Sequence, residues 1–303
     1  MGTVDNIQRA QPHLGTFVEI CSGGRNRAVT ERAIDAAFAE IAKVHRLMSF
    51  HNVDSDVSRL NRDAYGKSVV VNAWTYQVLE TALDVGRNSL GAFDISIAAA
   101  LQRLGRLPRH AWDWDQRRPQ TPANDTIVLL SGNRVRFRSA ATRIDLGGIA
   151  KGFAVDRALD VLRKHDQLHG LVNAGGDLAT FGVRPHTIHI RHPNSPHHSV
   201  CQVSIENAAL ASSACWLDLI HDNGPALASI IDPMRQKPAN DVAGASVRAP
   251  SCMIADALTK CVMIAGQHTV MLLKKYHASA LLVLRSGETL MTTEWQNAIS
   301  AAA

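Results

Sequence analysis

The cysteines of this chain follow no pattern that would mark a disulfide framework or a zinc site. There are five, Cys21, Cys201, Cys215, Cys252 and Cys261, with no Cys-x-x-Cys pair among them. An odd number of cysteines cannot all pair within one chain, so we expect buried free thiols.

Long apolar runs are also absent. Residues 1–13 contain no apolar segment of signal-peptide type and no cleavage pattern, and no later apolar run reaches the roughly 18 residues of a membrane span. We therefore expect a soluble chain with no transmembrane segment, cytoplasmic as the chain stands.

Three further absences narrow the function and the domain organisation. The net charge of +5 comes without a clustered basic helix or interleaved aromatic residues, so we expect no nucleic acid partner. No segment reads as Gly-x-Gly-x-x-Gly after an N-terminal strand, which disfavours a nicotinamide dehydrogenase. No linker and no internal repeat divides the chain.

The hydrophobic pattern predicts alternating strands and helices. A chain of 303 residues with 46% hydrophobic content can bury a large core. Spacing predicts strands over 16–21, 126–130, 134–138 and 279–284, with several short strands up to about 232. It predicts helices over 29–48, from Asn72 to near Gly91, over 149–165, and from Ser251 through Ala265.

The polar run 192–198 contains three histidines and two prolines. The prolines break any regular ligand spacing, so the run is typical of a solvated loop between strands, with a histidine metal site as the alternative.

The segment Arg143-Ile-Asp-Leu-Gly-Gly-Ile-Ala-Lys-Gly-Phe-Ala-Val-Asp156 joins an acidic strand end to a glycine turn and a helix start. Gly147 and Gly148 permit positive φ and close backbone approach, so amide donors could converge on an anion at the positive end of the helix. Lys151 adds a cation, and Asp145 adds a partner for a ribose or a metal. A plain strand-to-helix connection, with glycines that serve packing, is equally compatible with the segment.

The predicted late helix carries Asp256 and Thr259, which share a face at positions i and i+3. A carboxylate and a hydroxyl are oxygen ligands of the kind that a hard divalent cation prefers. The alternative is a surface Asp256 that pairs with Lys260 at i+4.

Seven blocks over most of the chain, in the right order, resemble those of the ApbE family, the FAD:protein FMN transferases. The blocks are Leu14-Gly-Thr-Phe-Val-Glu19, Met48 to Asn61, Gly91-Ala-Phe-Asp94, the central segment 143–156, Leu171-Val-Asn-Ala-Gly-Gly-Asp177, Ile230-Ile-Asp-Pro233 and Ala255-Asp-Ala-Leu-Thr259.

The resemblance implies one domain over residues 1–303, with an α+β fold of mixed sheets flanked by helices and a flavin cleft between two lobes. It implies Mg²⁺-dependent transfer of the FMN moiety of FAD, the substrate, to a Thr or Ser hydroxyl, with release of AMP. The partner is then an acceptor flavoprotein with a Ser/Thr flavinylation motif. Many family members are exported, so a periplasmic location is the alternative if a leader was removed.

The resemblance also assigns site residues. The implied catalytic residues are Asp256 and Thr259, which with the backbone carbonyl of Gly148 are the implied Mg²⁺ ligands. The implied FAD contacts are Leu14, His51, Ala92, Phe93, Asp94, Asp145 and Lys151.

The chain departs from the family pattern at several positions. Lys260 stands where many members place a Thr whose hydroxyl serves the metal, and it could reach a phosphate or hold Asp256 in an ion pair. Ser229 replaces a His that is implicated in catalysis, and His51 replaces a Tyr near the flavin. Ala214 and Gln236 replace glycines.

These departures keep two other hypotheses open. An FAD-binding or carrier protein would keep FAD but have impaired transfer. A metal-dependent FAD pyrophosphatase would use water in place of the protein hydroxyl.

Overall fold

A computed structural model describes residues 5–111, 122–182, 185–214, 230–239 and 241–299. Its largest sheet has eight strands in the order β1-β2-β6-β7-β10-β13-β14-β15, and every neighbouring pair is antiparallel. The bounds are β1 Asp5–His13, β2 Thr16–Gly24, β6 His169–Ala174, β7 Asp177–Gly182, β10 Ala209–Ala214, β13 Val242–Ala249, β14 Ser279–Leu284 and β15 Thr289–Met291.

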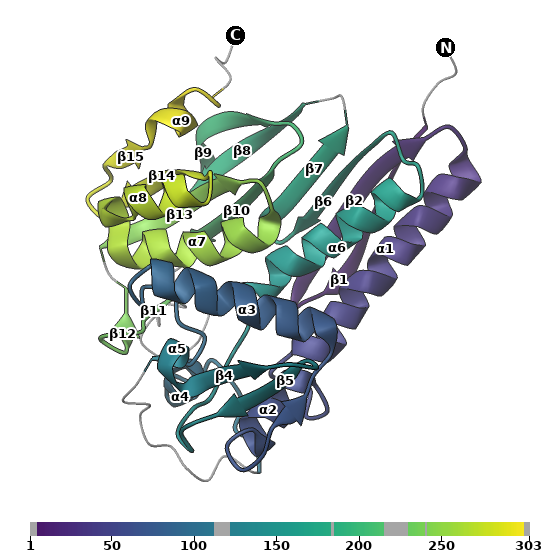
Figure 1. Cartoon of the computed structure of the whole chain (residues 1–303). Helices are drawn as coiled ribbons and strands as arrows, with labels where there is room; N and C mark the ends of the chain where they lie inside the picture. Colours follow the sequence, from purple (N-terminus) through teal and green to yellow (C-terminus); the bar gives the residue numbers. More distant parts are fainter. Residues whose placement is uncertain (1–4, 112–121, 183–184, 215–229, 240, 300–303) are drawn as a thin grey trace.

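Three long helices, α1 (Arg27–Met48), α6 (Ala150–Lys164) and α7 (Cys252–Ala265), cover one face of this sheet (Figure 1). The apolar stripe predicted for the first of them is buried against the sheet, with Ile34 and Ile41 completely inaccessible. Full burial of such a side chain contributes roughly 1.5–3 kcal/mol, so this stripe fixes α1 on the sheet. The predicted helix caps are present, since the side chains of Asn72 and Ser251 accept backbone N–H groups of the first helical turns.

The opposite face is covered by the hairpin of β8 (His186–His192) and β9 (Ser195–Ile205) and by the short α9 (Thr293–Gln296). Trp295 is completely buried there, in one cluster with Ile190 and Val203 of the hairpin. The prediction of a loop over 192–198 is therefore wrong for most of the run, because β9 already begins at Ser195. Polar composition predicted exposure, but backbone pairing across the two-residue turn still forms strands.

A second lobe lies at the other end of the molecule, from α3 downward in Figure 1. Its three-stranded sheet has the order β3-β5-β4 and contains the predicted strand pair. The elements are α2 Asp56–Asp63, β3 Val69–Val70, α3 Ala73–Asn88, α4 Ala98–Arg103, α5 Ala123–Thr126, β4 Ile127–Leu130 and β5 Arg134–Phe137. The remaining elements are β11 Ile231–Asp232, β12 Lys237–Pro238, the 3₁₀ helix Gly266–Thr269 and α8 Val270–Lys275.

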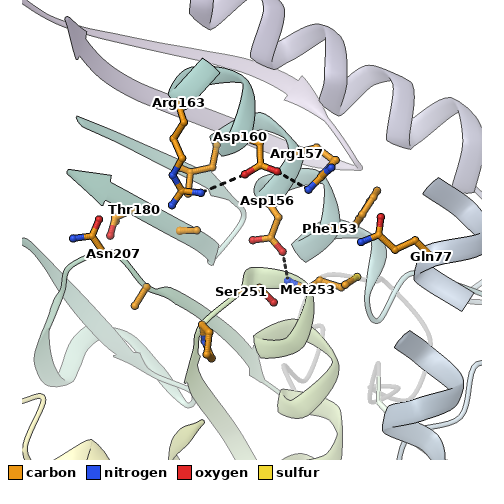
Figure 2. A pocket seen from close by; sticks show the side chains of 14 residues that line it. Gln77, Phe153, Asp156, Arg157, Asp160, Arg163, Thr180, Asn207, Ser251 and Met253 are labelled. Carbon is orange, nitrogen blue, oxygen red and sulfur yellow. Dashed lines mark hydrogen bonds and ion pairs between the residues drawn. The ribbon is translucent and has the colours of Figure 1, made fainter. Parts of the chain in front are cut away.

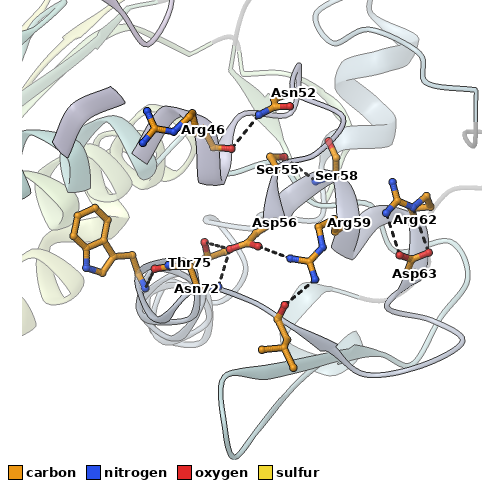
Figure 3. Close-up of polar contacts among 12 residues, drawn as sticks. Arg46, Asn52, Ser55, Asp56, Ser58, Arg59, Arg62, Asp63, Asn72 and Thr75 are labelled. Carbon is orange, nitrogen blue, oxygen red and sulfur yellow. Dashed lines mark hydrogen bonds and ion pairs between the residues drawn. The ribbon is translucent and has the colours of Figure 1, made fainter. Parts of the chain in front are cut away.

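A buried carboxylate joins α2 to α3 in this lobe (Figure 3). Asp56 Oδ2 accepts the backbone N–H of Asn72 at 2.8 Å and the hydroxyl of Thr75 at 2.7 Å, and Oδ1 accepts from Arg59 at 3.0 Å. Every polar contact of this carboxylate is thus internal to the lobe, which assigns Asp56 a structural role.

The α+β fold class is confirmed. Four of the predicted free thiols, Cys21, Cys201, Cys252 and Cys261, are unpaired, although only the last two are fully buried; Cys215 lies outside the described residues. Among the described residues, no helix is both long enough and apolar enough to cross a membrane.

Candidate functional site

A cleft of about 470 Å³ is lined on one side by residues of the second lobe and on the other by the helix side of the main sheet. The loop after α3 contributes Ala92, Phe93 and Asp94, and α6 and α7 contribute Lys151 and Lys260. The central glycine turn and the turn after β6 complete its lining with Gly148 and Gly175.

Close packing of α6 on α7 brings the two lysines together. A Cβ atom at Gly152 would overlap the carbonyl group of Cys252, so only glycine permits this approach. Each helix also caps the other. Asp156 of α6 accepts the N–H groups of Cys252 and Met253 at 2.8 and 2.9 Å, and Asp256 of α7 accepts that of Gly152 at 3.0 Å.

Two ion pairs lie beneath the cleft. Lys151 Nζ contacts Asp177 Oδ2 at 2.5 Å, and Lys260 Nζ pairs with Asp256 Oδ1. Both carboxylate side chains are 0% exposed, whereas those of Lys151 and Lys260 are 31% and 19% exposed. The ammonium groups therefore separate two buried negative charges from the cleft.

The four charges influence one another strongly. Burial alone would lower the pKa of Lys151, but the charges of Asp177 and Asp256 outweigh it and hold this pKa above its usual value. Burial and the charge of Asp256 raise the pKa of Asp177, although Lys151 opposes that rise. Two ammonium groups at the base of a cleft can bind an anion such as a phosphate.

Two of the three groups predicted to hold a metal contact Lys260, and the third, Gly148, lies near its side chain. Its ammonium contacts Asp256 and the hydroxyl of Thr259, the latter at 3.2 Å, and a Cβ atom at Gly148 would lie 3.6 Å from its Cε. Thr259 Oγ1 also donates to the carbonyl of Asp256 at 2.7 Å and lies 2.9 Å from Ser213 Oγ.

The central glycine turn differs from the sequence prediction. Neither Gly147 nor Gly148 adopts a positive φ. The N–H of Gly147 donates to Asp145 Oδ2 at 3.0 Å, so a carboxylate of the chain itself occupies that donor. Burial raises the pKa of Asp145, and its hydrogen bonds and the nearby His51 oppose this rise.

Asn61 fixes the segment that carries Asp145, which is not the strand end that the sequence predicted, because β5 already ends at Phe137. The side-chain amide of Asn61 donates to the carbonyl of Ile144 at 2.8 Å and accepts the N–H of Ile144 at 2.7 Å, and the residue is only 3% exposed. In the sequence, Asn61 stands only at the end of a family block, with no role assigned to it. Its long-range partner, 83 residues away, leaves no local signal in the sequence.

Asp94 has its carboxylate engaged within the protein. Oδ1 accepts the N–H and the hydroxyl of Ser96, both at 2.7 Å, and Oδ2 accepts the N–H of Ala123 at 3.1 Å. Burial raises the pKa of Asp94. The carboxylate thus holds the loop of Ala92 and Phe93 against α5.

Two predicted FAD contacts lie outside the lining of this cleft. Leu14, with φ of 55°, lies at the β1–β2 turn and lines a separate surface hollow with Phe17 and His45. His51 is exposed, close enough to Asp145 for its charge to act on that carboxyl group. Ser229 lies outside the described residues, whereas Ala214 lines the cleft at the end of β10.

A second hollow, of about 320 Å³, lies beside α6 and the start of α7 (Figure 2). Its charges are already paired, because Asp160 bridges Arg157 at 2.5 Å and Arg163 at 3.3 Å, and Asp156 caps α7. We therefore assign this hollow a structural role and take the larger cleft as the candidate active site.

The similarity of this chain to known proteins extends over most of its length. The chain matches the profile of the ApbE family over residues 1–282. It is 26% identical to the FAD:protein FMN transferase of Vibrio cholerae over 94% of this chain and 85% of that protein. It is 25% identical to the protein of the same name from Treponema pallidum, over 90% and 83%.

Solved structures show the same fold. The ApbE protein of Thermotoga maritima superposes with a TM-score of 0.87 at 23% identity, covering 98% of this chain and all of that one. The flavin transferase ApbE from Vibrio cholerae superposes with a TM-score of 0.81 at 21% identity, covering 97% and 99%. The match of the family profile to nearly the whole chain leads to one conclusion: this protein is a member of the ApbE family.

Proposed function

We propose that this protein transfers the FMN moiety of FAD to a Ser or Thr hydroxyl of an acceptor flavoprotein and releases AMP. The observation that carries the proposal is the pair of ammonium groups, Lys151 and Lys260, at the base of a cleft whose rim holds Ala92 and Phe93. Relatives named FAD:protein FMN transferase support the same activity.

The cleft suggests how FAD is held. We assign the isoalloxazine and ribityl groups to the side of Ala92, Phe93 and Asp94, with Leu14 and His51 as contacts at the outer edge. Lys151 and Lys260 face the pyrophosphate, where their charge offsets that of the phosphates. Asp145 also lines the cleft, and we assign its carboxylate to a ribose hydroxyl beside its bond to Gly147.

In the reaction, the acceptor hydroxyl oxygen attacks the phosphorus of the FMN half of the pyrophosphate. The bond from that phosphorus to the bridging oxygen breaks, and the bridging oxygen leaves as part of AMP. The hydroxyl proton passes to solvent or to the leaving phosphate. Lys151 and Lys260 stabilise the charge that develops on the phosphate oxygens, and Asp177 and Asp256 position them.

Mg²⁺, which the family resemblance implies, does not fit the donor set as it lies. Asp256 is already engaged by Lys260 and by the N–H of Gly152, and the hydroxyl of Thr259 is engaged by three neighbours. In the part of the chain that the structure describes, no group of three His, Cys, Asp or Glu side chains is arranged for a metal. The mechanism above therefore uses only the lysines.

The test is to incubate the protein with FAD and an acceptor that carries a Ser/Thr flavinylation motif, with and without Mg²⁺. We expect the acceptor to gain the mass of one FMN in parallel with AMP release. A matched acceptor with Ala in place of the motif hydroxyl is the control.

The same assay separates the other two hypotheses. Free FMN and AMP without acceptor would indicate a pyrophosphatase. Tight FAD binding with neither product, across several acceptors, would indicate a carrier and overturn the transferase proposal.

A further inference from the structure

We infer that the ammonium group of Lys260 takes the place of a divalent cation at Asp256, so that this site binds and activates a pyrophosphate with a cation that belongs to the chain. The inference rests on the proposed function for its catalytic part, but its binding part can be tested separately.

Lys260 lies where a metal ion would have to bind. The resemblance implies three metal ligands: the carboxylate of Asp256, the hydroxyl of Thr259 and the carbonyl of Gly148. The first two contact the ammonium group of Lys260, and Gly148 lines the same cleft beside this side chain. An ion at Asp256 would have to displace the ammonium from a carboxylate that is 0% exposed.

The charges at the floor of the cleft are already balanced without a metal ion. The floor of the cleft holds the buried carboxylates of Asp177 and Asp256, each paired with an ammonium group from Lys151 or Lys260. Their charges already cancel. A divalent ion would add two positive charges beside two ammonium groups, in a partly buried setting where screening by water is weak.

The two lysines are exposed enough to reach a ligand in the cleft. Both line the cleft, and they are the more exposed members of their ion pairs. Each ammonium can therefore keep its carboxylate while it donates to a phosphate oxygen, because it has three N–H donors. This is the role of a bridging cation: it is held by the protein on one side and faces the pyrophosphate on the other.

The experiment compares wild type with Lys260→Thr, Lys260→Gln and Lys260→Arg. Lys164→Thr is the matched control, since Lys164 is exposed in the last turn of α6, away from the cleft. Three readouts are FAD affinity in EDTA and in Mg²⁺, Mn²⁺ binding followed by electron paramagnetic resonance with FAD present, and FMN transfer. Circular dichroism identifies any variant that fails to fold.

For wild type we expect FAD affinity and the transfer rate in EDTA to stay within about twofold of their values in Mg²⁺. We expect no stoichiometric binding of Mn²⁺. In EDTA, the transfer rate and FAD affinity of Lys260→Thr should fall about 100-fold, the size expected for the loss of one electrostatic group. This variant should also bind Mn²⁺ stoichiometrically. Lys260→Gln should lose as much transfer and FAD affinity but should not bind Mn²⁺. In Lys260→Arg, both FAD affinity and transfer should stay independent of metal.

Stoichiometric Mn²⁺ in wild type, or loss of FAD binding and transfer in EDTA with rescue by Mg²⁺, would overturn the inference. If no transfer occurs under any condition, the proposed function fails. The Mn²⁺ and FAD measurements then still decide whether Lys260 replaces the metal. If Lys260→Thr does not fold, Lys260→Gln and wild type decide it.

Discussion

At the scale of the residue, Asn61 controls where Asp145 lies, because it holds both backbone polar groups of Ile144. Asn61→Ala leaves these two buried groups unpaired, at about 1–3 kcal/mol each. We expect a clear drop in the denaturation midpoint and at least a tenfold loss of FAD affinity, measured by urea unfolding and flavin fluorescence. Asn297→Ala, at an exposed position, is the control and should change neither.

Single residues also define what the sequence could predict about the site. The family blocks identified the cleft residues Ala92, Phe93 and Lys151, because each lies in a short motif that is contiguous in the sequence. The Asp256–Lys260 pair was visible as an i, i+4 alternative, yet spacing could not decide between a metal and an ammonium. That choice depends on the burial of Asp256 and on Asp177, which comes from a distant strand.

At the scale of the element, the contact of α6 with α7 depends on Gly152. In Gly152→Ala the new methyl group meets the backbone of Cys252, so the helices must separate. We expect a loss of roughly 1–3 kcal/mol in unfolding free energy, the usual cost of overpacking, together with weaker FAD binding. Gly66→Ala is the matched control, because a Cβ there meets no atom within 4 Å. Equal stability of the two variants would contradict this account.

The buried carboxyl group of Asp156, which caps α7, gives the protein a pH dependence. Burial, aided by the charge of Asp160, raises the pKa of Asp156 from 3.8 to about 6. The folded state then binds this proton more tightly than the unfolded chain does. The contribution of Asp156 to the free energy of unfolding is therefore largest below about pH 4 and falls as the pH rises to about 6.

Asp156→Asn should flatten this part of the pH profile by an amount on the order of 2 kcal/mol. Urea unfolding at intervals between pH 4 and pH 7 measures it. Asp241→Asn, at an exposed position, is the control. If Asp156→Asn keeps the full wild-type slope of unfolding free energy against pH, the slope comes from other carboxylates.

Helices were the most predictable elements. The long helix 27–48 has a regular apolar spacing, and Asn72 and Ser251 mark helix starts through local hydrogen bonds. The strand β1 was not predicted, and the turn between β8 and β9 was predicted as a longer loop. Their sequences are polar, and they are strands because of their partners rather than their own spacing.

At the scale of the whole molecule, the order of the main sheet could not be read from the sequence. The alternation of strands and helices left the strand directions open, and only the family resemblance indicated an α+β fold. The antiparallel order pairs β10 with β7 and β13, which places Ser213 beside α7. These pairings join segments far apart in the chain, so no local pattern specifies them.

One core cluster includes Ile20 and Ile34 of the main body and Val135 and Phe137 of the second lobe. We therefore predict that residues 1–303 unfold as one domain, in a single calorimetric transition. FAD at about 100 times its Kd should raise the unfolding free energy by about 2.7 kcal/mol and shift this whole transition upward. Two transitions, of which FAD moves only one, would show that the lobes are independent domains.

The mutual capping of α6 and α7 has a mechanical consequence. Because each helix begins against a carboxylate of the other, neither can slide or tilt without uncapping both. The lysine-bearing wall of the cleft is thus a rigid body. We therefore expect any movement on FAD binding to occur in the opposite wall, the loop and short helix over residues 89–107.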